Sequence, residues 1–284
     1  MSLKIVFMGT PDFAVPSLET LHRDGHDVVL VVTRPDRPKG RGNILTPSPV
    51  KEHALRMGFP VCQPNSVKSR LFIEELRAIK PDIIVVVAFG QILNKTVLGI
   101  PEKGCINVHA SLLPLYRGAA PIHRAVMNGE SVTGVTTMYM DQGMDTGDII
   151  LKDETPIGED ETAGDIHDRL AVLGASLLSR TLRLVEKNEA PRVPQDNARA
   201  TYAPPLRRED EVIDWNMSCR VIRNKVRGLN PWPGAYTMFE GGILKVWKVS
   251  IVENAGPREA PGTVLAAGPA EGLLVACGDG VIEI

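Results

Sequence analysis

The sequence predicts an α/β fold, in which a mostly parallel, doubly wound sheet is followed by a small β-domain. Through the first two hundred residues or so, strands that are apolar along their whole length alternate with helical patterns. Such strands are typical of parallel sheets that helices cover on both faces. Near residue 190 the sequence becomes rich in proline and polar residues, and short strands with glycine turns follow. This pattern of short strands and glycine turns indicates a small β-barrel or β-sandwich.

The elements of the first part follow from hydrophobic periodicity. Continuous apolar runs predict strands at 4–8, 28–33, 82–88, 105–108, 134–140 and 148–151. Apolar residues at helical spacing predict helices at 15–23, 70–79 and 163–187. In an open parallel sheet, ligands bind beyond the carboxyl ends of the strands, so candidate functional residues are sought there.

A proline-rich stretch divides the chain. Residues 190–208 carry four prolines among polar side chains and predict a semi-rigid linker. We therefore expect a first domain at 1–189 and a second domain at 209–284. In the second domain one helix and four strands are predicted, at 218–227, 235–240, 244–251, 262–266 and 273–277.

The composition is that of a globular protein. Hydrophobic residues make up 43% and charged residues 23% of the 284 positions, which excludes disordered and fibrous chains. No apolar run is long enough to cross a bilayer, and no signal-peptide pattern follows Met1. The cysteines, at 62, 105, 219 and 277, are too scattered for a metal knuckle and too few for a disulfide scaffold. We expect a cytoplasmic protein with neither a metal nor a membrane partner.

The formal net charge is only −2, but basic residues gather locally. Five lie between positions 34 and 51 against a single acid, and four lie between 218 and 228 with no acid. Two such clusters on a nearly neutral chain indicate directed contact with an anionic partner. Taken alone, either cluster could instead be ordinary solvated surface charge with no binding role.

Asn107 and His109 are the first candidate catalytic residues. They alternate with apolar neighbours, so at strand period they share one face near a strand end. An amide can hold an oxygen that gains negative charge, and an imidazole can move a proton near neutral pH, so the pair suits acyl chemistry. The alternative is that Asn107 caps a turn and His109 only bonds backbone.

A polar loop at 140–148 carries three aspartates between two predicted strands. Their spacing lacks the pattern of a calcium-binding loop. One carboxylate could instead orient His109 and raise its basicity, or the loop could owe its composition to turn chemistry alone. The sequence also lacks the dinucleotide-binding, phosphate-loop, zinc-protease and serine-hydrolase motifs.

Taken in order, the motifs resemble the methionyl-tRNA formyltransferase family over essentially the whole chain. They are GTPDF at 9–13, RPDRPKGRG at 34–42, PSPVK at 47–51, NVH at 107–109, SLLP at 111–114, RGAAP at 117–121, GMDTG at 143–147, DW at 214–215, NPWP at 230–233 and KVWK at 245–248. The family moves the formyl group of 10-formyltetrahydrofolate to the α-amine of initiator methionyl-tRNA, for translation initiation. The resemblance implies a Rossmann-like catalytic domain and an OB-like β-barrel that contacts tRNA.

The resemblance also implies roles for particular residues. Asn107 would hold the oxyanion, His109 would assist it or relay the proton, and Asp145 would position His109, without a metal. The co-substrate would lie along two segments, with an apolar wall on one and free backbone groups on the other. These cofactor-binding residues are Ser111, Leu112, Leu113, Pro114, Ala88, Phe89, Gly90 and Gln91.

By the same resemblance, the loop at 33–49 grips the acceptor arm of the tRNA. Its four prolines and two glycines predict neither strand nor helix. Arg41, between two glycines, stands at the position that reaches the end of the stem, and Arg37 and Lys39 can pair with phosphates. The basic face of the second domain is a further candidate for tRNA contact, through Arg220, Arg223, Lys225 and Arg227.

Three other functions remain open at this point. The chain could formylate a nucleotide-linked amino sugar or a glycinamide ribonucleotide, although the loop around Arg41 would then serve no purpose. It could hydrolyse the cofactor to release formate, or it could be a binding module without activity. The family also continues with a further strand and a basic tail after the GDG at 278–280, so we expect weaker tRNA affinity from this apparently shortened sequence, which ends at Ile284. We expect a monomer.

Overall fold

A computed structural model describes residues 2–39, 42, 44–252, 256, 259–269 and 272–284. The chain forms two compact units. The first holds residues 1–117, 134–154 and 168–201, and the second holds 118–133, 155–167 and 202–284. Two segments of the predicted first domain, at 118–133 and 155–167, thus belong to the second unit. The predicted domain boundaries stay a prediction.

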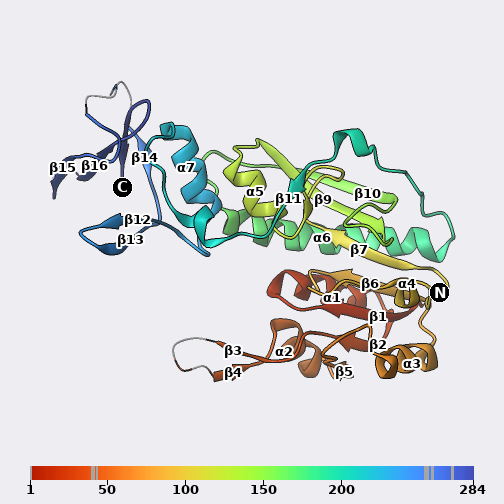
Figure 1. Cartoon of the computed structure of the whole chain (residues 1–284). Helices are drawn as coiled ribbons and strands as arrows, with labels where there is room; N and C mark the ends of the chain where they lie inside the picture. The colour runs from red at the N-terminus through yellow and green to blue at the C-terminus, as the bar shows by residue number, and fades with distance from the viewer. Residues whose placement is uncertain (1, 40–41, 43, 253–255, 257–258, 270–271) are drawn as a thin grey trace. The chain divides into compact units, whose positions relative to one another are not determined.

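The first unit is built on a seven-stranded sheet in the order β10-β9-β7-β6-β1-β2-β5. From β7 to β5 the neighbouring strands run parallel, and β9 is antiparallel to β7. Figure 1 shows β1, β2 and β6 side by side. This arrangement confirms the predicted α/β fold with a mostly parallel sheet. The strands span Lys4–Gly9 (β1), Asp27–Val32 (β2), Val61–Cys62 (β5), Ile83–Val87 (β6), Cys105–His109 (β7), Val132–Tyr139 (β9) and Ile149–Pro156 (β10).

The helices of the first unit begin where side chains cap them. Ser48 caps α2 (Pro49–Arg56) and Ser69 caps α3 (Arg70–Ile79), each accepting from a backbone N–H in the first turn. The remaining helices are α1 (Val15–Arg23), α4 (Lys95–Leu98) and α6 (Ala163–Glu186), with short 3-10 turns η1 (Asp12–Ala14) and η2 (Asn197–Arg199). The apolar side of α3, with Phe72 and Leu76, packs in one core cluster with the sheet.

Helix α6 covers one face of the sheet. A Cβ on Gly174 would come within 3.0 Å of Val108 and 3.7 Å of Val135, so glycine allows close packing there. The hydroxyl groups of Thr137 and Thr181 also join the sheet to the helix, at 2.8 Å. Because strand side chains alternate, Asn107 and His109 project from the opposite face. Helix packing on one side therefore leaves the other side for chemistry.

The segment 33–49 departs from its prediction. It was expected to be neither strand nor helix, but it contains a short antiparallel hairpin, β3 (Arg37–Lys39) with β4 (Ile44–Thr46), which Figure 1 shows beside α2. Two strands with no further neighbour in the described residues tolerate Pro38, because an edge strand can leave one side without ladder bonds. The carboxylate of Asp36 fixes the base of the hairpin, accepting from Lys51 at 2.5 Å and from Gln63 at 2.7 Å.

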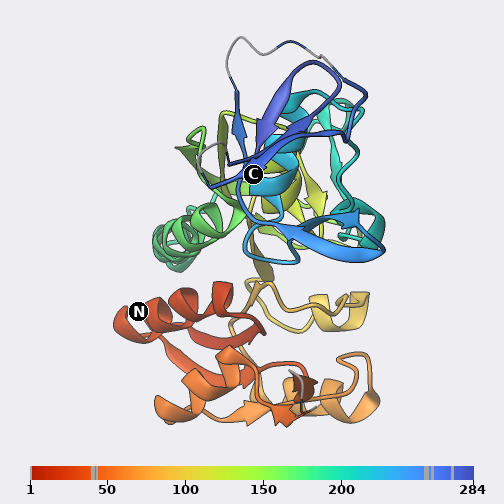
Figure 2. The ribbon, with the colours of Figure 1, turned by 90° about the vertical axis from the view of Figure 1, so that its left-hand side faces the viewer.

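The second unit combines helices with antiparallel strands. Helix α7 (Cys219–Gly228) contributes Ile222 and Val226 to its core, and Leu229 joins them. Strands β12 and β13 form one pair, and four strands form a sheet in the order β14-β17-β16-β15; Figure 2 shows the pair in a lighter blue. The bounds are α5 Pro121–Met127, η3 Arg208–Glu211, β8 Arg117–Gly118, β11 Tyr202–Ala203, β12 Ala235–Phe239, β13 Gly242–Val246, β14 Ser250–Ile251, β15 Val264–Gly268, β16 Gly272–Ala276 and β17 Val281–Glu283. The β-rich second part is confirmed, and its closure into an OB-like barrel stays a prediction.

None of the helices in the described part of the chain is both long enough and apolar enough to span a bilayer.

An ion pair in the second unit gives a prediction about stability. Arg124 on α5 donates to both carboxylate oxygens of Asp210, at 2.9 and 2.7 Å, and this lowers the pKa of Asp210. A carboxyl whose pKa is lowered by folding stabilises the protein above its unfolded pKa, about 4, and this contribution is lost as the pH falls through the folded pKa. Asp210→Asn should therefore cost roughly 1–3 kcal/mol at neutral pH. Thermal unfolding at pH 7 and near pH 3 checks this, since a penalty that persisted in acid would contradict the assignment.

Candidate active site

The candidate site lies where β6 and β7 end, at neighbouring positions in the sheet. Val86 of β6 pairs with Asn107 of β7, so residues 88–91 follow directly beside the end of the strand that carries Asn107 and His109. On the other side, Asn107 lies opposite Met138 and His109 opposite Thr136 of β9. The predicted placement of the two polar side chains on one strand, two positions apart, is observed.

His109 is 6% exposed and is held from two sides. Its Nε2 lies 3.0 Å from the carbonyl oxygen of Tyr116, and its Nδ1 lies 3.7 Å from Oδ2 of Asp145. A carbonyl oxygen can only accept, so Nε2 must carry the hydrogen. In the neutral ring this leaves the lone pair on Nδ1, the nitrogen that faces the carboxylate. The imidazole is thus oriented to take a proton at Nδ1.

Asp145 belongs to the loop between β9 and β10. Its backbone is left-handed, with φ of 54°, and its side chain is 17% exposed. Gly147, two residues on, has no room for a side chain, because a Cβ would lie 1.8 Å from the carbonyl oxygen of Tyr139. The structure brings Asp145 to His109, and in the described residues it is the aspartate of the loop whose carboxylate comes within 4 Å of that imidazole, at 3.7 Å.

Asn107 is partly exposed in the middle of β7. Within the part of the chain that the structure describes, no hydrogen bond of its side-chain amide is seen. An amide without a protein partner, on the same face as His109, can donate to the oxygen of a bound acyl group.

The segment 111–114 has two kinds of residue. The hydroxyl of Ser111 donates to the Leu115 carbonyl at 2.6 Å, and Leu113 is buried with Met138 and Ile149. These two residues shape the turn, while Leu112 and Pro114 are partly exposed. Thr136 fixes the turn from β9, donating to the Ser111 carbonyl and accepting from the N–H of Leu113.

The segment 88–91 is similarly divided. Ala88 and Gly90 are exposed and have positive φ angles of 45° and 81°, so their backbone groups leave the strand direction. Phe89 is buried. The side chain of Gln91 accepts from the Val67 N–H and donates to the Pro64 carbonyl, so it braces the segment rather than projecting from it.

The predicted tRNA-binding residues of the hairpin are only partly described. Arg37 is exposed on β3. The backbone of Lys39 belongs to the same strand, and Arg41 lies outside the described residues.

The four basic residues of α7 that were predicted to contact tRNA differ in their surroundings, and their role stays a prediction. Arg220 is exposed, but Arg223 bonds Asp160 at 2.8 Å, and Lys225 donates to the Val212 carbonyl. Arg227 is only 9% exposed and donates to the carbonyls of Gly158 and Glu161. Counting charges along the sequence did not distinguish the side of the helix that packs inward. Arg227 stabilises the second unit, Arg223 and Lys225 are half-buried, and Arg220 is exposed.

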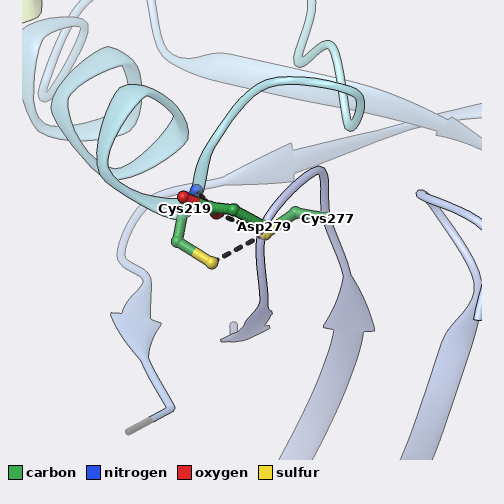
Figure 3. A group of neighbouring side chains, drawn as sticks. All are labelled: Cys219, Cys277 and Asp279. Atoms are coloured by element: carbon green, nitrogen blue, oxygen red, sulfur yellow. Dashed lines mark hydrogen bonds between the residues drawn. The ribbon is translucent and has the colours of Figure 1, made fainter. Parts of the chain in front are cut away.

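Sequence spacing also gave no sign that two distant cysteines meet. Cys219 at the start of α7 and Cys277 after β16 are buried with their sulfurs 2.7 Å apart, and Asp279 accepts from the Cys219 N–H at 2.7 Å (Figure 3). The possible ligand atoms of these three side chains lie within 4.8 Å of one another, close enough to share a metal ion. However, two thiolates on one tetrahedral zinc lie about 3.8 Å apart, farther than these two sulfurs. The group is better explained as a helix cap above a buried thiol pair.

Two residues near the site were missed by the sequence analysis. Gln195, in the stretch predicted as a linker, donates to the carbonyls of Asp145 and Gly147, both at 2.8 Å. Arg117, noted only as part of a motif, donates to Gln195. A buried arginine followed far along the chain by a glutamine carries no pattern that sequence reasoning could recognise.

Comparisons with known proteins bear on this geometry. Residues 3–182 match the family described as formyl transferase, and residues 205–284 match the family described as the formyl transferase C-terminal domain. A methionyl-tRNA formyltransferase of Moorella thermoacetica is 55% identical over 98% of this chain and 89% of its own length. One of Pelotomaculum thermopropionicum is 54% identical over 99% of this chain and 90% of its own.

Solved structures share the fold at low identity. The N-formyltransferase of Helicobacter canadensis, in complex with folinic acid and dTDP-3-aminofucose, matches with a TM-score of 0.73 at 21% identity, over 99% of this chain and 98% of that one. HypX of Aquifex aeolicus, in complex with tetrahydrofolic acid, matches with a TM-score of 0.68 at 18% identity, over 99% of this chain and 43% of that one.

Proposed function

The chain belongs to the formyl transferase family, among the methionyl-tRNA formyltransferases, and from this we propose that Asn107, His109 and Asp145 carry its reaction. It transfers the formyl group of 10-formyltetrahydrofolate to the α-amine of initiator methionyl-tRNA. The product, N-formylmethionyl-tRNA, serves translation initiation. The observation that supports this site is the approach of the Asp145 carboxylate to Nδ1 of His109. His109 lies on the same strand, and on the same face of the sheet, as Asn107.

The mechanism follows from the charge that develops during transfer. The neutral amine attacks the formyl carbon, and the carbonyl oxygen becomes anionic. The amide of Asn107 donates to this oxygen and stabilises its negative charge. When the C–N10 bond breaks, the pair of electrons returns to N10 of the folate.

One proton must also move from the attacking amine to N10. Nδ1 of His109 takes this proton, because the Tyr116 carbonyl keeps the hydrogen of the neutral ring on Nε2. Asp145 stabilises the imidazolium that forms, and the same Nδ1 then delivers the proton to N10. No group is consumed, so the three side chains return to their starting states.

The co-substrate is 10-formyltetrahydrofolate, and we place it along the two segments that flank the trio. The exposed backbone of Ala88 and Gly90 can pair with the polar edge of a pterin, and Leu112 with Pro114 can contact its apolar faces. Ser111, Leu113, Phe89 and Gln91 hold these segments in place. The eight predicted cofactor residues thus divide into four that contact folate and four that support them.

We assign the acceptor arm of the tRNA to Arg37, Lys39 and Arg41 of the segment 33–49, with Arg220 as a second contact. Arg37→Ala or Arg41→Ala should lower kcat/KM for methionyl-tRNA about tenfold. Each variant should also lose less activity than the wild type when the salt concentration is raised, because one phosphate contact is already missing. Formate release from the folate should be unchanged. Equal losses in both reactions would contradict a role in tRNA binding.

We propose that the enzyme acts as a monomer in the cytoplasm, where charged tRNA is made. Sedimentation would reveal a dimer.

A transfer assay tests the proposed function against its alternatives. The protein is given 10-formyltetrahydrofolate with methionyl-tRNA, free methionine or an amino-sugar nucleotide, and both formylated product and free formate are measured. We expect product with methionyl-tRNA at a rate at least about 10³-fold above either small acceptor, since remote binding energy is used in the transition state. Faster formylation of the sugar nucleotide than of methionyl-tRNA would contradict the proposal. So would release of free formate at the same rate whether or not an acceptor is present.

A further inference from the structure

Arg117 is a buried charge with an unusual set of partners. It is only 2% exposed, although burying an unpaired guanidinium is very costly. Its Nε and Nη2 donate to Oε1 of Gln195, at 3.0 and 2.7 Å, and Nη2 also donates to Oδ1 of Asn197 at 2.9 Å. The partners described for this cation are therefore neutral amide oxygens.

These contacts fix the orientation of the Gln195 amide. A guanidinium only donates, so the atom facing Arg117 must be the oxygen, and the NH₂ group must point the other way. There it donates to the carbonyls of Asp145 and Gly147, at 2.8 Å each. All these residues belong to the first compact unit. A chain of hydrogen bonds thus runs from a buried cation to the backbone of the residue that faces His109.

The loop needs such support at this point. Asp145 has a left-handed backbone with φ of 54°, a conformation that aspartate adopts more often than most residues but less freely than glycine. At the other end of the loop, Asp141 accepts from Gly143 and Thr146 in exposed hydrogen bonds. Through its side-chain NH₂ group, Gln195 joins the carbonyls of Asp145 and Gly147 to the buried Arg117.

We propose that Gln195, oriented by Arg117, is a positioning residue that sets the Asp145 carboxylate against Nδ1 of His109. The inference rests on the proposed function, in which Asp145 stabilises the protonated imidazole. A displacement of about 1 Å in a catalytic group can lower a rate about 10²-fold. The support of the loop therefore affects turnover through Asp145, since the hydrogen bonds described for Gln195 are with protein groups.

Gln195→Glu separates this role from mere structural support. The glutamate keeps the size of the side chain and gives Arg117 a charged partner, so the protein should remain folded. A carboxylate cannot donate to the carbonyls of Asp145 and Gly147, and it repels them. We expect kcat to fall about 10- to 100-fold, with KM for methionyl-tRNA within about twofold of the wild type and an unchanged melting temperature.

Asn197→Asp is the matched control. It makes the same change from amide to acid beside the same guanidinium, but Asn197 donates to neither loop carbonyl in the described structure. We expect its kcat to stay within about twofold of the wild type. Equal losses in both variants would overturn the proposal, because the charge next to Arg117 would then be the cause.

A double-mutant cycle with Asp145→Asn completes the test. If Gln195 acts through Asp145, the Glu substitution should cost little once the carboxylate is gone, and the two losses should not multiply. Fully multiplicative losses, or a Gln195→Glu variant with wild-type kcat, would overturn the positioning role. Failure of the proposed function shows differently: Asp145→Asn alone would then leave kcat unchanged.

Discussion

Replacing His109 with glutamine is expected to lower kcat for formyl transfer by about 10²–10⁴-fold while the protein stays folded. Glutamine carries an NH₂ group that can replace Nε2–H as the donor to the Tyr116 carbonyl. It has no basic atom where Nδ1 faces Asp145, so the proton of the attacking amine has no acceptor. Single-turnover rates of N-formylmethionyl-tRNA formation measure the effect apart from product release.

The control for this substitution is His22→Gln, on the exposed surface of α1. It should leave the rate unchanged. A His109→Gln variant with near-wild-type turnover would remove the imidazole from the proton path. So would a loss of rate that only follows a loss of melting temperature, because it would show a structural role.

Replacing Asn107 with alanine is expected to lower kcat by about 10²–10³-fold, the usual cost of losing one oxyanion donor. The amide has no hydrogen bond to the described residues, so its removal leaves no orphaned protein group, and stability should change little. Asn107→Asp should be worse, because a carboxylate would lie next to the developing negative charge. The measurement is kcat at saturating folate and methionyl-tRNA.

Asn65→Ala, at an exposed position, serves as the matched control and should be neutral. The outcome that contradicts the oxyanion role is a loss confined to KM, with kcat preserved. Such a result would mean that Asn107 contributes equally to binding the ground state and the transition state.

The elements with a strong pattern were predictable from the sequence. The helix at 15–23 and the helix at 70–79 have the predicted bounds, because apolar residues at helical spacing must face the sheet. Helices α2 and α5 were missed. Each begins with proline, Pro49 and Pro121, which suggests a loop in sequence but fits the first position of a helix, where the N–H is not needed.

The candidate site was predictable to the extent that it lies on one strand. Strand period placed Asn107 and His109 on the same face, while the choice of Asp145 among three aspartates came from the family resemblance. Gln195 could not be predicted, because its role depends on the tertiary approach of residues 50 positions apart. The inward position of Arg227 likewise depends on the carbonyls of Gly158 and Glu161, which no helical pattern reveals.

The contact between Cys219 and Asp279 has a consequence for biosynthesis. The first turn of α7 receives its carboxylate cap from a residue 60 positions later in the chain. A nascent polypeptide can complete this turn only after both segments have emerged from the ribosome, whereas β1, β2 and β6 can pair much earlier. The first unit's central strands can therefore assemble while translation is still under way, and the second unit must mature last.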